Sequence, residues 1–207
     1  MRFESVARIV RTVPGVVLIV LLAGWCCDGG ASASDAHAWL QAQRLADGVY
    51  VLPGDTAAPD RHNQGRVGNL GFLIGRDGVV VIDTGSSRAR ALELMTAIRQ
   101  VTHKHPKVVL ISHPAQEFLF GNAAFIDRGA KVYAQAQTPR LMAERCDHCL
   151  ETLRGDLGAA RMAGTRLILP EPLDFVPGPV VLAGRRLTVT EGPPGAVPGN
   201  LLIRDDA

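Results

Sequence analysis

The chain has 207 residues, with 22 lysines and arginines against 20 aspartates and glutamates, which gives a formal net charge of +2 at pH 7. Aromatic residues make up only 5% of it, so composition and charge exclude the usual signature of a nucleic-acid-binding protein, and no nucleic-acid partner is expected. The length suits one domain behind an export signal.

The first 33 residues have the pattern of a secretory signal peptide. Three basic residues precede an apolar stretch at 13–23: Arg2, Arg8 and Arg11. This stretch is too short for a membrane-spanning helix, and Ala31-Ser32-Ala33 offers a cleavage site. We therefore expect a periplasmic or secreted protein in an oxidising compartment. The alternative is an uncleaved anchor, in which case this segment alone would contact the membrane.

Residues 34–44 are predicted to form a leader, and residues 45–207 a single domain. Its first strand lies within 45–54, and Asp77-Gly78 predicts a hairpin turn between the next two. A helix capped by Ser86 or Ser87 follows and runs to Val101. The remaining predicted strands lie at 69–74, 79–82, 108–111, 131–134, 167–169, 180–182, 186–190 and 200–203, with helices at 123–125 and 138–163. Strands followed by strand–helix alternation predict a mixed α/β (α+β) layer fold.

A motif follows the predicted strand at 108–111. It reads Ser112-His113-Pro114-Ala115-Gln116-Glu117-Phe118 and continues to Gly121-Asn122-Ala123-Ala124-Phe125. This resembles the (Thr/Ser)-His-x-His-x-Asp-His-x-x-Gly-Asn motif of the metallo-β-lactamase superfamily. The resemblance implies an αβ/βα sandwich and a zinc-dependent hydrolase. Gly121 to Phe125, the Cys146-x-x-Cys149 pair and the string at 162–165 are more closely similar to the quinoprotein-relay zinc hydrolases.

The resemblance also shows which metal ligands are replaced. His113 stands at the first histidine, Ala115 at the second, Glu117 at the aspartate and Phe118 at the last histidine of the motif. Ala196 stands at the histidine of a later His-Thr-Pro-Gly string, since Pro198-Gly199-Asn200-Leu201 keeps the rest of it. A catalytic zinc site needs three protein ligands and an open position, so zinc is implied by the family but is doubtful in this chain.

Some residues still carry candidate roles. If chemistry remains, His113 is the metal ligand and Glu117 is a ligand or the catalytic base. The resemblance implies that Asp83 braces the metal loop through backbone hydrogen bonds. The simpler alternatives are a hydrogen-bonded histidine at a strand end, a solvated glutamate and an aspartate that ends a strand.

Cys146 and Cys149 form the second candidate site. Two cysteines at this spacing can form a disulfide, bind a metal or remain reduced on a helix. In an oxidising compartment we favour the disulfide. A closed zinc site would need His148, which lies between them, and further ligands from elsewhere.

Three hypotheses follow for the function. The chain is a non-catalytic relative that binds a redox protein or a small molecule, an active zinc-dependent hydrolase with a rebuilt metal site, or a thiol–disulfide protein that uses Cys146 and Cys149. The first agrees best with the replaced ligands. The chain stops directly after a predicted interior strand, so we expect an incomplete sandwich whose exposed sheet edge favours self-association.

Overall fold

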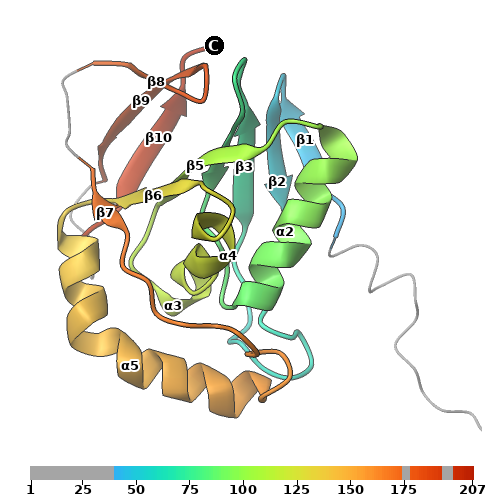
Figure 1. Cartoon of the computed structure of the whole chain (residues 1–207), viewed down its shortest axis with the longest axis vertical. Coiled ribbons are helices and arrows are strands. Elements are labelled where there is room, and N and C mark those ends of the chain that lie inside the picture. Colours follow the sequence, from blue (N-terminus) through green and yellow to red (C-terminus); the bar gives the residue numbers. More distant parts are fainter. Residues whose placement is uncertain (1–39, 174–177, 193–197) are drawn as a thin grey trace, which may run out of the picture. The chain divides into compact units, whose positions relative to one another are not determined.

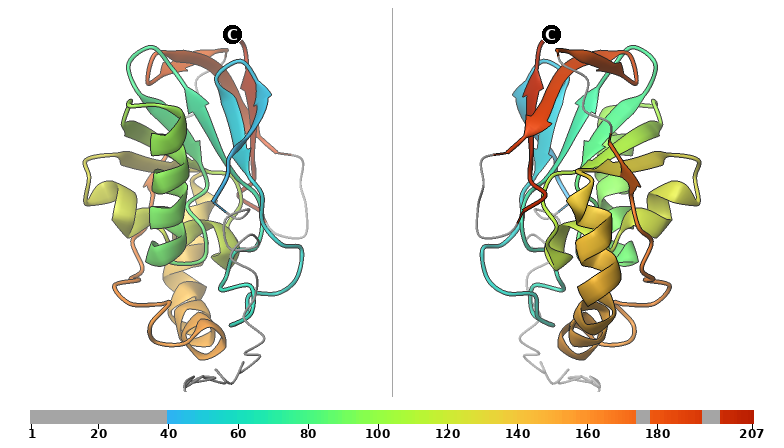
Figure 2. Two further views of the ribbon diagram at one scale, coloured as in Figure 1. Left: turned by 90° about the vertical axis from the view of Figure 1, so that its right-hand side faces the viewer. Right: turned by 90° about the vertical axis from the view of Figure 1, so that its left-hand side faces the viewer.

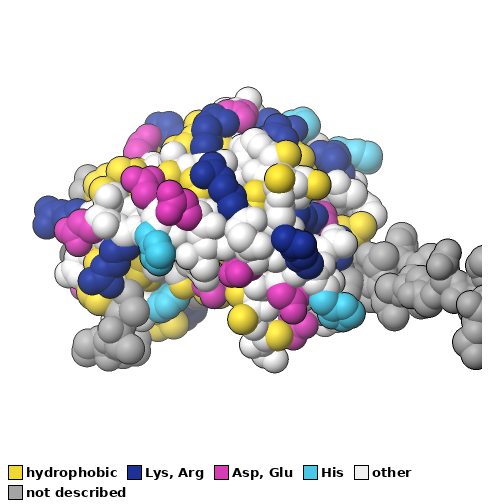
Figure 3. Space-filling view, turned by 90° about the horizontal axis from the view of Figure 1, so that it is seen from below, with side chains coloured by type: hydrophobic (Ala, Val, Ile, Leu, Met, Phe, Trp, Pro, Cys, Tyr) yellow, Lys and Arg dark blue, Asp and Glu magenta, His cyan; other side chains and the backbone are white. Residues whose placement is uncertain are grey.

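The computed structural model describes residues 40–173, 178–192 and 198–207. The predicted signal peptide and Ala196 lie outside these residues, as does most of the predicted leader. Within them, none of the helices combines the length and the apolar composition that a membrane crossing requires. On the face in Figure 3, basic and acidic side chains are interspersed with hydrophobic ones.

The larger sheet has seven strands in chain order, β1 to β7 (Figure 1). Its first four strands pair antiparallel and its last four pair parallel. The strands are β1 (Gln43–Ala46), β2 (Val49–Leu52), β3 (Leu70–Ile74), β4 (Val79–Ile82), β5 (Pro106–Ile111), β6 (Lys131–Ala134) and β7 (Glu171–Pro172).

The turn between β3 and β4 forms as predicted, and the amide of Gly75 donates to the carbonyl of Gly78 at 2.9 Å. Strand β4 is buried along nearly its whole length, as expected for an unbroken apolar run that is covered on both faces. Strands β4 and β5 are parallel neighbours, with Val81 opposite Val109. Their carboxyl ends therefore meet at one edge of the sheet.

Four helices are described: α2 (Arg88–Val101), α3 (Gln116–Leu119), α4 (Asn122–Ile126) and α5 (Gln137–Leu157). The side chain of Ser87 caps α2 by accepting from the amide of Arg90. Apolar residues at helical spacing on α2 and α5 join one face of the sheet in a continuous core, to which α4 also contributes. Figure 1 shows the placement of these helices.

A second sheet covers part of the opposite face. Its strands are β8 (Val180–Leu182), β9 (Arg185–Glu191) and β10 (Leu201–Asp205), paired antiparallel in the order β10-β9-β8. A smaller apolar core lies between the two sheets, with Val80 and Leu110 on one side and Leu187 and Leu201 on the other. Figure 2 shows the two sheets from both sides. The predicted α/β sandwich is confirmed, and β10 is an edge strand among the described residues.

Three predicted elements differ from the structure. Strand β1 begins at Gln43, inside the predicted leader, because it pairs with β2. The helix predicted to reach residue 163 ends at Leu157, because Gly158 takes φ of +81° and ψ of 161°, a backbone conformation outside the helical region that glycine adopts readily. Residues 167–169 form no strand, and the carbonyl of Ile168 instead accepts from the side-chain amide of Asn122 at 3.0 Å.

Candidate functional site

The candidate site lies where β4 and β5 end. Asp83 directly follows β4, and Ser112 and His113 directly follow β5. Because the two strands are parallel neighbours, these residues meet at the carboxyl edge of the sheet, where open α/β sheets commonly bind ligands. Residues 112–118 are called the site loop below.

Asp83 is buried and holds the start of the site loop. Its carboxylate accepts from the amide of Ser112 at 2.7 Å and from the Ser112 hydroxyl at 2.6 Å. Burial raises the pKa of Asp83 to about 7, although both bonds from Ser112 act in the opposite direction. Asp83 also has φ of +63°, a left-handed conformation that aspartate tolerates better than most residues. Asp83 therefore ties the end of β4 to the first residue of the site loop, and its role in supporting a metal site stays a prediction.

Thr84 ties the far end of the loop to the same strand. Its amide donates to the carbonyl of Phe118 at 2.7 Å, and its hydroxyl lies 2.9 Å from Oδ1 of Asn122. Gly121 packs so closely here that an added Cβ would lie 2.2 Å from the carbonyl oxygen of Thr84. Only glycine fits at this position. Five residues joined by these contacts form the frame of the site: Asp83, Thr84, Ser112, Gly121 and Asn122.

Inside this frame, the side chains differ from those of a zinc site. His113 Nδ1 pairs with the Oδ1 atom of Asn200, and the rings of His113 and Phe118 meet edge to face at 6.2 Å. The Phe118 ring also covers Gly68, where an added Cβ would lie 2.5 Å from the ring. Ala115 precedes α3 without a side-chain cap.

Glu117 lies on α3 and is half-buried. It makes no hydrogen bond or ion pair to another residue in the described parts of the chain. Across those parts, no three His, Cys, Asp or Glu side chains converge as a metal site would require. The donor set, His113 and Glu117, therefore does not fit a catalytic zinc ion.

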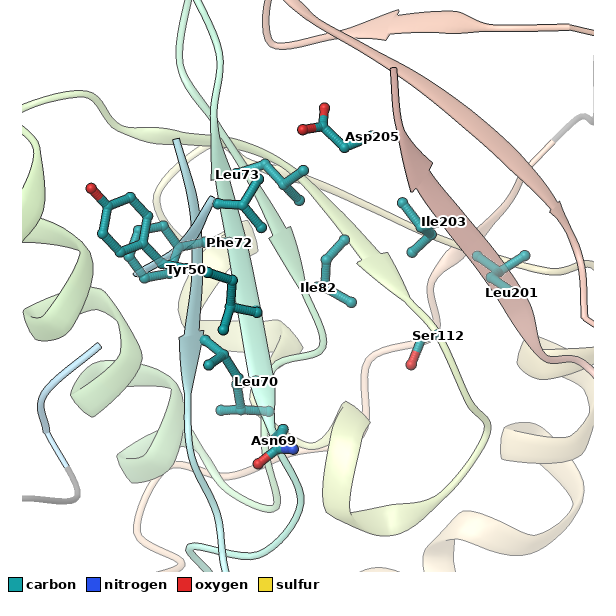
Figure 4. Close-up of a pocket in the computed structure, with 14 residues that line it drawn as sticks. Tyr50, Asn69, Leu70, Phe72, Leu73, Ile82, Ser112, Leu201, Ile203 and Asp205 are labelled. Carbon is teal, nitrogen blue, oxygen red and sulfur yellow. The ribbon is translucent and has the colours of Figure 1, made fainter. Parts of the chain in front are cut away.

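A groove of about 370 Å³ lies beside the frame, between β2 and β3 on one side and β10 on the other (Figure 4). Its walls are mainly apolar, with Leu73 and Ile82 facing Leu201 and Ile203. Ser112, which binds Asp83, also lines this groove. The groove therefore joins an apolar surface to the polar frame, and its volume is within the range of small-molecule sites.

A charge cluster that the sequence did not reveal holds the loops around the site. Glu93 on α2 binds Arg66 at 2.8 Å, Arg90 at 3.2 Å and Arg161 at 2.8 Å. Burial by itself would raise the pKa of Glu93, but hydrogen bonds and charge from Arg161 and Arg66 lower it to about 2. Arg161 also donates to the carbonyl of Gln64 at 2.7 Å. The only local signal was the Arg90–Glu93 spacing on the helix.

Cys146 and Cys149 lie on α5 as free thiols, Cys146 buried and Cys149 half-buried. Burial, together with the charge and hydrogen bond of Cys149, raises the pKa of Cys146 to about 12. This is the opposite of the lowered pKa that activates redox thiols. His148 is exposed and is no part of the cavity beside the cysteines. The disulfide stays a prediction for the oxidised chain.

The family model of the metallo-beta-lactamase superfamily matches residues 64–207. This match covers more than half of the chain, and the chain belongs to that superfamily. No curated protein matches the sequence.

Solved structures show the same fold at low sequence identity. A metallo-beta-lactamase from Pontibacter korlensis has a TM-score of 0.58 and 18% identity over 80% of this chain and 66% of its own. One from Hirschia baltica has a TM-score of 0.53 and 16% identity, with the same coverage. The sec-alkylsulfatase Pisa1 from Pseudomonas sp. has a TM-score of 0.58 and 17% identity over 80% of this chain and 29% of its own. The chain thus spans just under two thirds of the length of the first two.

Proposed function

We propose that this chain is an exported, non-catalytic member of the superfamily that binds a small molecule or a redox partner protein. The observation that carries the proposal is the kind of side chain that stands at the positions of the zinc ligands. Two positions that the resemblance assigns to zinc-binding histidines hold Ala115 and Phe118, and the Phe118 ring packs against Gly68 and His113. The closer relation to the quinoprotein-relay hydrolases is part of this proposal and rests on the sequence strings alone.

The groove beside the frame supports the binding half of the proposal. It offers an apolar surface from Leu73, Ile82 and Ile203, with Ser112 at one end, whereas Asp205 at the other end is ion-paired with Arg185. A ligand suited to it is apolar over most of its length and carries a hydrogen-bonding group at one end. The matched hydrolases suggest the fold for such a site and not its substrate, because their identity to this chain is at most 18%.

The test measures the zinc-to-protein ratio of the purified chain. Three further versions are measured beside it: Ala115→His/Glu117→Asp/Phe118→His, the same triple variant with Ala196→His, and Cys146→Ser/Cys149→Ser. We expect no stoichiometric zinc in the unaltered chain. The variants with restored histidines are expected to gain zinc, because the frame that orients the loop is retained.

Each alternative outcome favours a different hypothesis. Near-stoichiometric zinc in both the unaltered chain and the double cysteine variant would contradict the proposal and favour an active hydrolase with a rebuilt site. Zinc that is bound by the unaltered chain and lost only in the double cysteine variant would show that the metal binds at α5. If the restored variants fold, as judged by circular dichroism, but bind no zinc, the frame does not position ligands as proposed.

A further inference from the structure

Helix α5 carries three sulfur-containing side chains on one face. Met142, Cys146 and Cys149 are four and three residues apart, a spacing that places them one above another along a helix. Met142 and Cys146 are buried, and Cys149 is half-buried. All three line one cavity of about 200 Å³. The Cys149 thiol donates to the carbonyl of Arg145 at 3.4 Å.

This set of donors selects among metals. Thiolate and thioether sulfurs are soft ligands that favour Cu(I), whereas structural zinc requires four ligands in a tetrahedron. No third His, Cys, Asp or Glu joins the cysteines within the described parts of the chain, and His148 is exposed. We propose that Cys146, Cys149 and Met142 form a binding site for Cu(I), independent of the family's zinc position.

Binding of Cu(I) at this site needs no redox partner. Cu(I) forms one bond to each cysteine sulfur, both S–H bonds break, and two protons leave to solvent while copper keeps its oxidation state. Two thiolates and one Cu(I) carry a net charge of about −1. Arg145 lines the same cavity and supplies a compensating positive charge.

The location connects this site to the site loop. Pro114 and Gln116 line the cavity opposite α5. A metal ion bound by the helix would therefore fill the space beside the loop and restrict the loop's movement. Nothing in this arrangement uses His113 or Glu117, so the copper site and the proposed loss of catalytic zinc are tested separately.

The experiment is an anaerobic Cu(I) titration of the reduced chain against bicinchoninate as a competing chelator. Cys26 and Cys27 are first changed to serine, so that only the α5 cysteines contribute thiols. We expect one Cu(I) per chain, with the ultraviolet charge-transfer absorption of Cu(I)–thiolate bonds. Cys146→Ser or Cys149→Ser is expected to weaken binding by more than about a hundredfold, and Met142→Leu by about tenfold.

Two variants serve as matched controls. Met162→Leu alters another buried methionine that does not line the cavity, and His148→Ala alters the exposed residue between the cysteines. Neither is expected to change Cu(I) affinity. Thermal unfolding of every variant separates loss of the site from loss of the fold, and Met142→Leu nearly conserves side-chain volume.

Three results would overturn the proposal. Cu(I) held equally well by the Cys146→Ser/Cys149→Ser chain would place it elsewhere. Zinc that competes with Cu(I) on equal terms would contradict the argument from soft ligands. A Cys146–Cys149 disulfide that Cu(I) with excess reductant does not open, detected by alkylation and mass spectrometry, would show a structural bridge in place of a metal site.

Discussion

The frame and two of the positions inside it, Ala115 and Glu117, differ sharply in how firmly the fold holds them. Asp83, Thr84 and Gly121 are fixed by short hydrogen bonds or by backbone contact. Ala115 has no capping side chain, and Glu117 has no polar partner among the described residues. The frame stabilises the join between two strands and the helices after them, whether or not a metal binds. Ala115 and Glu117 can therefore change while the fold persists.

The largest effect is expected from breaking the frame at Gly121. The Gly121→Ala Cβ would lie 2.2 Å from the Thr84 carbonyl oxygen and 2.7 Å from Cβ of Ala91, so the backbone must shift. We expect a loss of about 3 kcal/mol in the free energy of unfolding, measured by urea denaturation. Gly155→Ala is the matched control, because nothing lies within 4 Å there and the helix gains about 1 kcal/mol. Equal stability of the two variants would show that the frame is not rigid.

A smaller loss is expected at Asp83. Asp83→Ala leaves the amide of Ser112 without its buried acceptor and should cost about 2 kcal/mol in the same measurement.

Asp83→Asn keeps an acceptor and removes the titration. Because burial raises the pKa from 3.8 to about 7, the unfolded chain loses this proton first as pH rises. The carboxyl therefore contributes most below pH 3.8, and its contribution falls as pH approaches 7. This decrease in the free energy of unfolding between pH 3.8 and 7 should be absent in Asp83→Asn. If the substitution leaves the decrease unchanged, other groups cause it.

The smallest effect is expected inside the frame. Glu117→Ala removes a half-buried carboxylate that no described residue binds, so the free energy of unfolding should change by less than about 0.5 kcal/mol. Urea denaturation at neutral pH checks this value. A loss as large as that of Asp83→Ala would mean that Glu117 belongs to the frame, and the contrast between the two regions would fail.

The sequence by itself determined the elements that depend on local pattern. The β3–β4 hairpin, the Ser87 cap of α2 and the buried strands β4 and β5 follow from turn residues, capping and apolar runs. The motif at 112–125 contains three of the five frame residues, Ser112, Gly121 and Asn122, and their contacts to Asp83 and Thr84 join the ends of two adjacent strands.

Only the tertiary structure decided which side chains share a site. Asn200 meets His113 across 87 residues of chain, and Arg161 meets Glu93 across 68, and no local pattern records either distance. The ring of Phe118 covers Gly68, and Met142 shares a cavity with the two cysteines and the site loop. Such contacts depend on how separate elements pack, and periodicity along one segment reports only which face of that segment is buried.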